Sequence, residues 1–177
     1  TNQLSATGQA KTALDKALFE AITDKGVKVG LQTTRANFFD SKDATKNIPI
    51  LVGGYEGSEI KNVLTNGKES KIVLTKQLFN LEQSEKVEKA GLSTVGTDAA
   101  HEILESFYGG KDDPGGDYSS GFQKAHEKAI AVDPGAKELF PNKNTKTNSL
   151  GLTDGKGTSV DLINLSAPKT KVDDEEK

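Results

Sequence analysis

Three residue types are missing from this chain of 177 residues: it has no cysteine, no methionine and no tryptophan. Because cysteine is absent, the fold has neither disulfide bonds nor thiolate metal ligands, and a zinc site would be built from His, Asp or Glu. The composition is compatible with an oxidising or a reducing compartment. Since the chain begins at Thr1 and lacks methionine altogether, we expect a processed product or a segment of a larger protein.

Long apolar runs and strongly basic segments are also missing. No run approaches the roughly 20 apolar residues that a transmembrane helix needs, and the N-terminus lacks the basic-then-apolar order of a signal peptide. The net charge is -3 and the pI is near 5.5, without a dense cluster of Lys and Arg. The sequence therefore predicts neither a membrane span nor a nucleic-acid partner.

The length and composition favour a single main domain. With 33% hydrophobic residues, the chain is long enough for one compact core and too short for two ordinary domains to be the expectation. Apolar residues recur at helical spacing from Leu4 to Ile22, and strand-like stretches follow at 27–31, 48–52 and 70–75. The first half of the chain is thus predicted to form a helix and a small sheet.

The second half is predicted to be mainly helical. We expect helices over 77–90, 98–108 and 119–132, a hairpin that pairs 150–152 with 160–163, and a disordered acidic tail over 166–177. Thr97 is a good N-cap for the second of these helices, and the pair Gly109–Gly110 is expected to end it. The main domain would then span 1–165, with its C-terminal hairpin at 150–163.

The string His101-Glu102-x-x-Glu105 lies within the helix predicted over 98–108. Residues four apart on a helix share one face and lie about 40° apart, so His101 and Glu105 can reach the same point in front of the helix. Glu102 is about 100° further round and can address a water molecule there without binding the metal itself. This is the geometry of His-Glu-x-x-His zinc hydrolases, with Glu105 in the place of the second histidine.

A catalytic zinc needs a third protein ligand, and His126 is the only other histidine. It shares a helical face with apolar residues such as Phe122, so it is predicted to point inward. The glycine-rich loop between the two helices is long enough to fold them against each other. We therefore predict a Zn²⁺ site formed by His101, Glu105 and His126, with Glu102 as the general base.

Three further side chains are candidates to support this centre. Asp98, one turn before His101, is a candidate hydrogen-bond partner for an imidazole N–H. Tyr108, close to His101 on the helical wheel, and Tyr118, in the connecting loop, are candidate donors to an oxyanion. Two nitrogens and one oxygen suit zinc, although iron, manganese and nickel also occupy sites with two histidines and a carboxylate.

Structural explanations exist for each of these residues. A His-Glu-x-x-Glu string arises easily by chance, and Glu102 with Glu105 can be a solvated helix face. A histidine on an apolar face, such as His126, is more often a core residue than a ligand. The glycine pairs are more often turn formers than phosphate cradles, since none of them lies in a P-loop or dinucleotide-binding pattern.

Two segments of the chain resemble a pattern found in C-terminal domains of Rhs-type and other polymorphic secreted proteins of Bacteroidetes. They are 98–110, Asp-Ala-Ala-His-Glu-Ile-Leu-Glu-Ser-Phe-Tyr-Gly-Gly, and 122–129, Phe-Gln-Lys-Ala-His-Glu-Lys-Ala. In that pattern a His-Glu-x-x-Glu helix is followed, after a variable loop, by an Ala-His motif. The resemblance covers about 95–132, and Gly53-Gly-Tyr-Glu-Gly57 adds a weaker match upstream.

The pattern looks like that of zincin-like metallopeptidase toxins, and the resemblance implies His101, Glu105 and His126 as zinc ligands and Glu102 as general acid and base. It also implies a strand that borders the active cleft and pairs with extended substrate, for which 70–75 is the natural candidate. The implied partners are a protein or peptide substrate, a cognate immunity protein and a secretion apparatus. The domain would be secreted or delivered into a target cell. No His-x-x-Gly-x-x-His extension of the familiar zincin motif follows here.

These observations favour an α+β fold in which a small, mainly antiparallel sheet packs against the helices that carry the motif, in a zincin-like arrangement. The predicted function is zinc-dependent hydrolysis of peptide bonds. Two other functions stay open. One is a metal-free cell-wall glycosidase that uses Glu102 or Glu105 as its acid. The other is a non-catalytic structural, cargo or adaptor domain of a secretion apparatus, in which both histidines are core residues.

Overall fold

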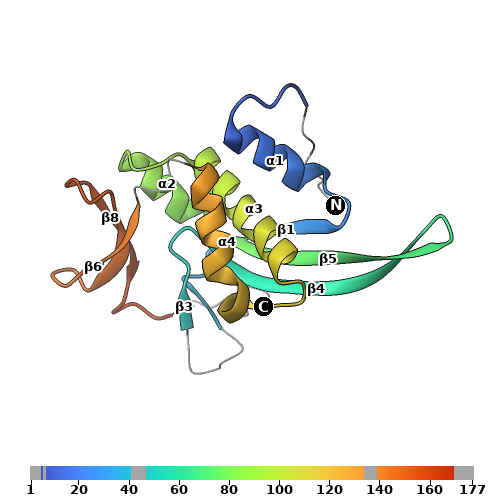
Figure 1. Ribbon diagram of the computed structural model, residues 1–177. Helices are drawn as coiled ribbons and strands as arrows, with labels where there is room; N and C mark the ends of the chain where they lie inside the picture. The colour runs from blue at the N-terminus through green and yellow to red at the C-terminus, as the bar shows by residue number, and fades with distance from the viewer. Residues whose placement is uncertain (1–4, 6, 41–46, 134–138, 170–177) are drawn as a thin grey trace.

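The computed structural model describes residues 5, 7–40, 47–133 and 139–169 (Figure 1). Within these residues the chain forms four helices and three small sheets, which confirms the expected α+β class. In chain order the elements are α1 Ala13–Thr23, β1 Val27–Thr33, β2 Phe38–Asp40, β3 Asn47–Pro49, β4 Gly53–Thr65, β5 Lys68–Phe79, α2 Leu81–Lys89, α3 Val95–Asp112, α4 Tyr118–Val132, β6 Phe140–Asn144, β7 Ser149–Thr153 and β8 Ser159–Asn164. Across the described ranges, no helix is long and apolar enough to cross a membrane.

The largest sheet has the strand order β1-β5-β4, so β5 is its central strand. β5 pairs with β1 in parallel and with β4 in antiparallel orientation, which makes the sheet mixed rather than mainly antiparallel. Along 73–79 both edges of β5 are occupied by these neighbours. β5 therefore has no free edge along 73–75, and the expectation that 70–75 pairs with an extended substrate is wrong for these residues.

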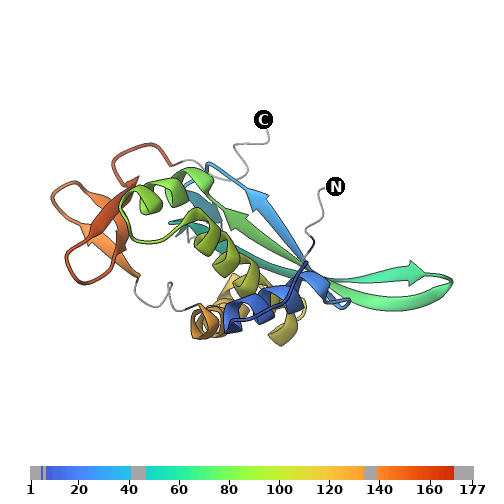
Figure 2. The ribbon, with the colours of Figure 1, turned by 90° about the horizontal axis from the view of Figure 1, so that it is seen from above.

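β4 and β5 are longer than the sequence patterns predicted. They form one hairpin whose turn, Asn66-Gly67, has positive φ angles of 51° and 75°, the conformation that an Asn-Gly pair favours. The far end of this hairpin extends away from the rest of the molecule as a two-stranded ribbon (Figures 1 and 2). The sheet β6-β7-β8 lies at the opposite end of the molecule in both views.

The pair Gly53–Gly54, for which the sequence favoured a turn, begins strand β4. The extended segment before it, β3, covers only Asn47–Pro49. A Cβ atom at position 53 would lie 2.1 Å from the Cδ atom of Glu102. Glycine is required there because the carboxyl group of the motif helix lies directly against the start of β4.

Helix α3 begins earlier and ends later than predicted. Its N-cap is Thr94, whose Oγ1 accepts a hydrogen bond from the N–H of Thr97 at 3.1 Å. The helix also continues through Gly109–Gly110, which was expected to end it. A Cβ atom at Gly109 would lie 2.6 Å from Cζ of Tyr55, so the glycines allow the helix to lie close to the sheet. The local signals for the start and end of a helix were misleading here, because tertiary packing determines where α3 begins and ends.

The other predicted elements need smaller changes. The helix predicted over 77–90 starts only at Leu81, because 77–79 belongs to β5 and Asn80 acts as N-cap. The hairpin predicted between 150–152 and 160–163 is confirmed as β7-β8, and β6 adds a third strand. The acidic tail expected at 166–177 lies mostly outside the described residues.

Two hydrophobic clusters hold these elements together around α3. The first joins α3 to α1, α4 and β1, and Leu104 and Phe107 are fully buried within it. The second joins β7 and β8 to α2 and β2, with Val87 and Ile163 among its buried members. Helix α3 thus packs against the sheet on one side and against α4 on the other, which fixes the position of the motif that it carries.

Candidate metal centre

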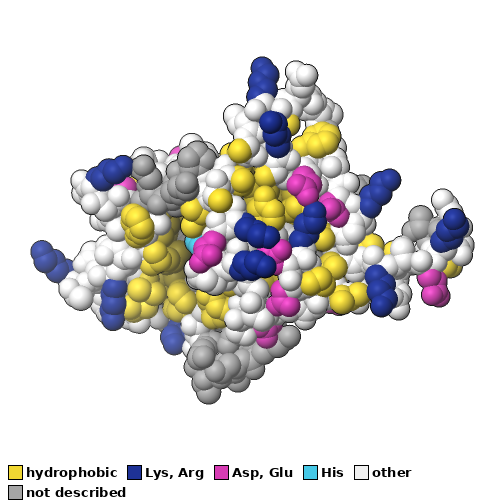
Figure 3. Space-filling model, viewed as in Figure 1, with side chains coloured by type: hydrophobic (Ala, Val, Ile, Leu, Met, Phe, Trp, Pro, Cys, Tyr) yellow, Lys and Arg dark blue, Asp and Glu magenta, His cyan; other side chains and the backbone are white. Residues whose placement is uncertain are grey.

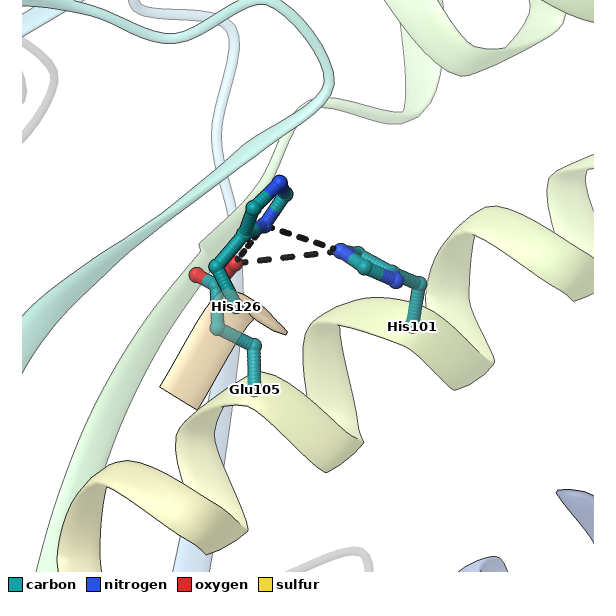
Figure 4. A group of neighbouring side chains, drawn as sticks. All are labelled: His101, Glu105 and His126. Carbon is teal, nitrogen blue, oxygen red and sulfur yellow. Dashed lines mark hydrogen bonds and ion pairs between the residues drawn. The ribbon is translucent and has the colours of Figure 1, made fainter. Parts of the chain in front are cut away.

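Helices α3 and α4 bring His101, Glu105 and His126 together. Both α3 residues are buried, and they lie one turn apart on the same face, as the four-residue spacing predicted. His126 projects from α4 toward them (Figure 4). Each residue offers one ligand atom to the same small volume, so the three side chains form a group able to hold a metal ion.

The distances between the three donor atoms describe a compact triangle. Nε2 of His101 lies 3.3 Å from Nδ1 of His126 and 3.8 Å from Oε2 of Glu105, and the third side, from Nδ1 of His126 to Oε2 of Glu105, is 2.8 Å. Tetrahedral zinc with bonds of about 2.0–2.1 Å separates its ligand atoms by about 3.3 Å. The donor triangle brackets this value, so the three residues fit a tetrahedral ion without rearrangement of the helices.

The protonation state of His101 also suits a ligand. Burial lowers the pKa of His101 below its ordinary value, an effect that the carboxylate of Glu105 opposes. The imidazole is therefore neutral at physiological pH, which is the form that binds a metal. The His101 and His126 rings meet edge to face, with centroids 5.1 Å apart, so that a nitrogen of each ring faces the other.

The carboxylate of Asp133, at the C-cap of α4, lies next to the imidazole ring of His101. Its Oδ2 lies 3.8 Å from Nδ1 of His101, on the side of the ring away from the donor triangle, and its carboxylate is almost completely buried. At this distance the two atoms form no hydrogen bond, and within the described residues Nδ1 of His101 has no hydrogen-bond partner. The negative charge of a carboxylate on this side favours the tautomer that is protonated at Nδ1 and presents Nε2 to a metal. The sequence made Asp98 the candidate for this role, but Asp98 accepts a hydrogen bond of 2.5 Å from Oγ of Ser84 instead.

Glu102 lies beside the triangle and lines the same cavity. It is buried against Gly53, and its Oε2 accepts a hydrogen bond from Nε2 of Gln77. Burial raises the pKa of Glu102 well above its ordinary value, and the nearby carboxylate of Glu105 raises it further. The side chain thus has the position and the proton affinity of an acid–base group next to a metal site.

Gln77 on β5 links the two carboxyl groups of the motif. Its Nε2 donates to Glu102 and lies 3.4 Å from Oε1 of Glu105, and its side chain is completely buried. Gln77 was not among the residues predicted for the site, because the sequence pattern placed it at the start of a helix. Had the strand been extended beyond Thr75, the two-residue period would have put Gln77 on the face that meets α3.

An aromatic stack runs along α4 to the third donor. The rings of Tyr118 and Phe122 are stacked with centroids 4.6 Å apart, and those of Phe122 and His126 with centroids 5.3 Å apart. The stack orients the His126 ring toward the triangle. Tyr118 lines the cavity, as one candidate oxyanion donor should, whereas Tyr108 packs against the core cluster around α1 and is absent from the described cavity lining.

Comparisons with protein-family models, with curated proteins and with solved structures return no match for this chain. The interpretation of the site therefore rests on its geometry. Three donors of suitable type converge, a buried carboxylate supports one imidazole, and a carboxyl group with a raised pKa lies beside them.

Proposed function

We propose that this chain is a zinc-dependent peptide-bond hydrolase, a metallopeptidase-like effector or toxin domain with a zincin-like arrangement of its site. The observation that carries the proposal is the convergence of His101, Glu105 and His126 in a cavity that Glu102 also lines. A structural histidine pair would require neither the carboxylate in the triangle nor a second carboxyl group beside it.

The metal would be held by Nε2 of His101, Nδ1 of His126 and Oε2 of Glu105. A bound zinc ion supplies a Lewis acid that polarises a carbonyl group and favours ionisation of water near neutral pH. Because the protein contributes three ligands, one position stays open for a reactant, as in catalytic rather than structural zinc sites. The carboxylate of Asp133, 3.8 Å from Nδ1 of His101, would favour the tautomer that leaves Nε2 to the metal.

Glu102 is the residue that moves the proton. Gln77 holds Oε2 of Glu102 by a hydrogen bond, which leaves Oε1 to exchange the proton. This carboxyl group would accept a proton from the attacking water and return it to the nitrogen of the departing amine. Burial raises the pKa of Glu102, and the higher proton affinity of its carboxylate favours acceptance of the proton from water.

Delivery into another cell, with a secretion apparatus and an immunity protein as partners, is the part of the proposal that rests on the resemblance of 95–132 to polymorphic toxins. The zincin-like arrangement has a structural argument in addition. The motif helix α3 lies against β4, an edge strand of the main sheet, with Glu102 in contact with its first residue, Gly53.

A metal-free carboxylate hydrolase, such as a cell-wall glycosidase, is the second candidate. The observation in its favour is the pair of buried carboxyl groups, Glu102 and Glu105, that Gln77 links, because glycoside hydrolysis uses two carboxyl groups, one of them with a raised pKa. Such an enzyme would keep its activity after chelation and after replacement of His126. The donor triangle favours the metal-dependent reaction, since a glycosidase has no use for two imidazoles that face one carboxylate.

The first experiment is to measure the metal content of the purified protein by elemental mass spectrometry. We expect about one zinc per chain in the wild type and none in His101→Ala or His126→Ala, each checked for folding by circular dichroism. Glu127→Ala is the matched control, because it removes an exposed carboxylate next to His126 on the same helix. A wild-type protein that takes up no zinc even after incubation with it contradicts the proposal.

The second experiment is to test the zinc-loaded protein against a mixed peptide library. Glu102→Gln should keep its zinc and lose about 10²- to 10⁴-fold in the cleavage rate, the usual contribution of a general base. If activity survives both chelation and His126→Ala, the metal-free hydrolase is the correct account. If Glu102→Gln cleaves peptides as fast as the wild type, Glu102 does not carry the proton.

A further inference from the structure

The donor triangle lies in the wall of a cavity of about 590 Å³. One wall consists of α3 and α4, with the motif residues and the ring of Phe122. Most of the other lining residues come from the segment 48–53, from Leu139 and from strands β6 and β7. In the space-filling view a hollow surrounded by hydrophobic side chains opens between the C-terminal sheet and the helices, with a histidine at its border (Figure 3).

The wall opposite the helices is strongly apolar. It is lined by Ile48, Leu51, Val52, Leu139, Leu150 and Leu152. These side chains come from two parts of the chain that are far apart in sequence. Most of them also belong to or pack against the second hydrophobic cluster, so they combine a structural role with an apolar surface toward the cavity. Apolar side chains around an accessible cavity next to reactive groups are typical of a substrate-binding pocket.

Most of the charged residues that line the cavity lie on its helical wall. The carboxylates of Asp98, Glu102 and Glu105 all lie on α3, where they are engaged by Ser84, Gln77 and His126 respectively. On the opposite wall, Lys143 is the single charged lining residue within the described part of the chain, and it is exposed. A charged side chain that entered the apolar part would therefore lose its hydration, and within the described lining of this wall the exposed Lys143 is the one charged group that it could pair with.

We infer that this cavity binds the apolar side chain of a peptide substrate, so that the enzyme cleaves next to large aliphatic or aromatic residues. The inference rests on the proposed function and names its substrate class. A peptide is favoured over a lipid because Ser93, Gln123 and Asn142 also line the cavity and offer hydrogen-bonding groups to a polar backbone. A pocket of this size holds one or two large side chains.

Binding can be tested without turnover. Capped peptides of the form acetyl-Gly-X-Gly-amide, with X as Leu, Phe, Asp or Lys, are titrated into metal-free Glu102→Gln protein and followed by NMR. The Leu and Phe peptides should bind at least about 10-fold more tightly than the Asp peptide, since a single methylene in such a pocket changes selectivity by about 10- to 200-fold. The shifted resonances should include those of Leu51 and Leu150.

A matched pair of variants locates the effect. Leu150→Lys places a charge in the apolar wall and should abolish the preference for Leu peptides, whereas Phe140→Lys changes an exposed residue that is not among the described lining residues and should preserve it. Leu51→Thr, on the other segment of the wall, should reduce the preference for Leu peptides. It replaces Leu150→Lys in the test if that variant does not fold. Equal affinity for Leu and Asp peptides overturns the inference.

The activity measurement separates this inference from the proposed function. If zinc-loaded wild type cleaves library peptides without regard to apolar residues beside the bond, the hydrolase stands and the pocket assignment fails. If no peptide is cleaved although Leu peptides bind selectively through Leu150, the pocket stands and the proposed chemistry fails. Cleavage next to Leu and Phe that Leu150→Lys alters, and Phe140→Lys does not, supports both.

Discussion

The two helices that carry the histidines differ in how deeply they are set in the molecule. α3 has buried residues along most of its length, whereas the buried residues of α4 are Gly121, Ala125 and Ala129. Accordingly the His101 side chain is 10% exposed and that of His126 is 35% exposed. α3 is therefore a fixed part of the core, while α4 contributes one of the three candidate metal donors from a more exposed position. Changes in α3 should disturb the fold, and changes in α4 mainly the site.

The largest effect of the difference in burial between α3 and α4 is expected at two helical glycines that face the ring of Tyr55. A Cβ atom would lie 2.6 Å from the Tyr55 ring at Gly109 of α3 but 3.5 Å from it at Gly121 of α4. Because Tyr55 is fully buried, its ring cannot move aside. Gly109→Ala should lower the free energy of unfolding by about 1–3 kcal/mol through overpacking. Gly121→Ala should be neutral or stabilise by up to about 1 kcal/mol, the difference in helix propensity.

Chemical denaturation of both variants in metal-free form checks this prediction. Because the same substitution is made in two helices against one ring, helix propensity contributes similarly to both. If Gly121→Ala is destabilised as much as Gly109→Ala, the two helices are equally constrained and the comparison between them is wrong.

The next effect concerns the carboxylate that α4 contributes to the α3 histidine. Asp133→Asn should weaken zinc binding by about 10- to 100-fold, the usual consequence of removing a carboxylate that orients a ligand imidazole. Asp112→Asn is the matched control, because Asp112 joins α3 to α4 through an ion pair of 2.7 Å with Lys128, remote from the donor triangle. Calorimetric titration with zinc measures both. An equal loss in the control would assign the effect to helix docking.

The donor set could be predicted from the sequence because it depends on local geometry. The four-residue spacing of His101 and Glu105 determines that they share a face, and the apolar neighbours of His126 indicate that it points inward. The supporting residues could not be predicted in this way. Asp133 reaches His101 only because α4 folds back along α3, and nothing in the sequence around 133 indicates which ring it faces.

Two glycines show the same limit of prediction from the sequence. Local rules interpreted Gly53 as a turn former and Gly109 as the end of a helix, but each lies where two elements approach closely. Each glycine is required by the size of the group that packs against it, which is the Glu102 carboxyl group at Gly53 and the Tyr55 ring at Gly109. A residue-by-residue pattern does not contain that information, since the partners are dozens of positions away.

The aromatic stack of α4 allows a smaller perturbation of the site. Phe122→Ala removes the ring between Tyr118 and His126 and should weaken zinc binding by about 2- to 10-fold, because aromatic pairs contribute about 0.5–1.5 kcal/mol. Phe122→Leu keeps most of the volume without the ring and separates ring stacking from cavity formation. A loss as large as that of His126→Ala would mean that the whole helix had moved.

The smallest effect expected is a pH dependence of stability that belongs to α3 alone. Burial raises the pKa of Asp98 above its ordinary value of 3.8, against the opposing effect of its hydrogen bond from Ser84. Between 3.8 and the raised pKa the folded chain binds more protons than the unfolded chain, so the free energy of unfolding falls as pH rises through that window. Above the raised pKa this contribution is constant.

Asp98→Asn should remove this slope, while Glu127→Gln, which alters an exposed carboxylate of α4, should leave it unchanged. Denaturation of the metal-free proteins at a series of pH values, expressed as the difference from wild type, cancels the titration of the other carboxylates. A difference curve for Asp98→Asn that is flat with pH would show that the buried face of α3 tolerates the charge. The contrast between the two helices would then be one of packing and not of electrostatics.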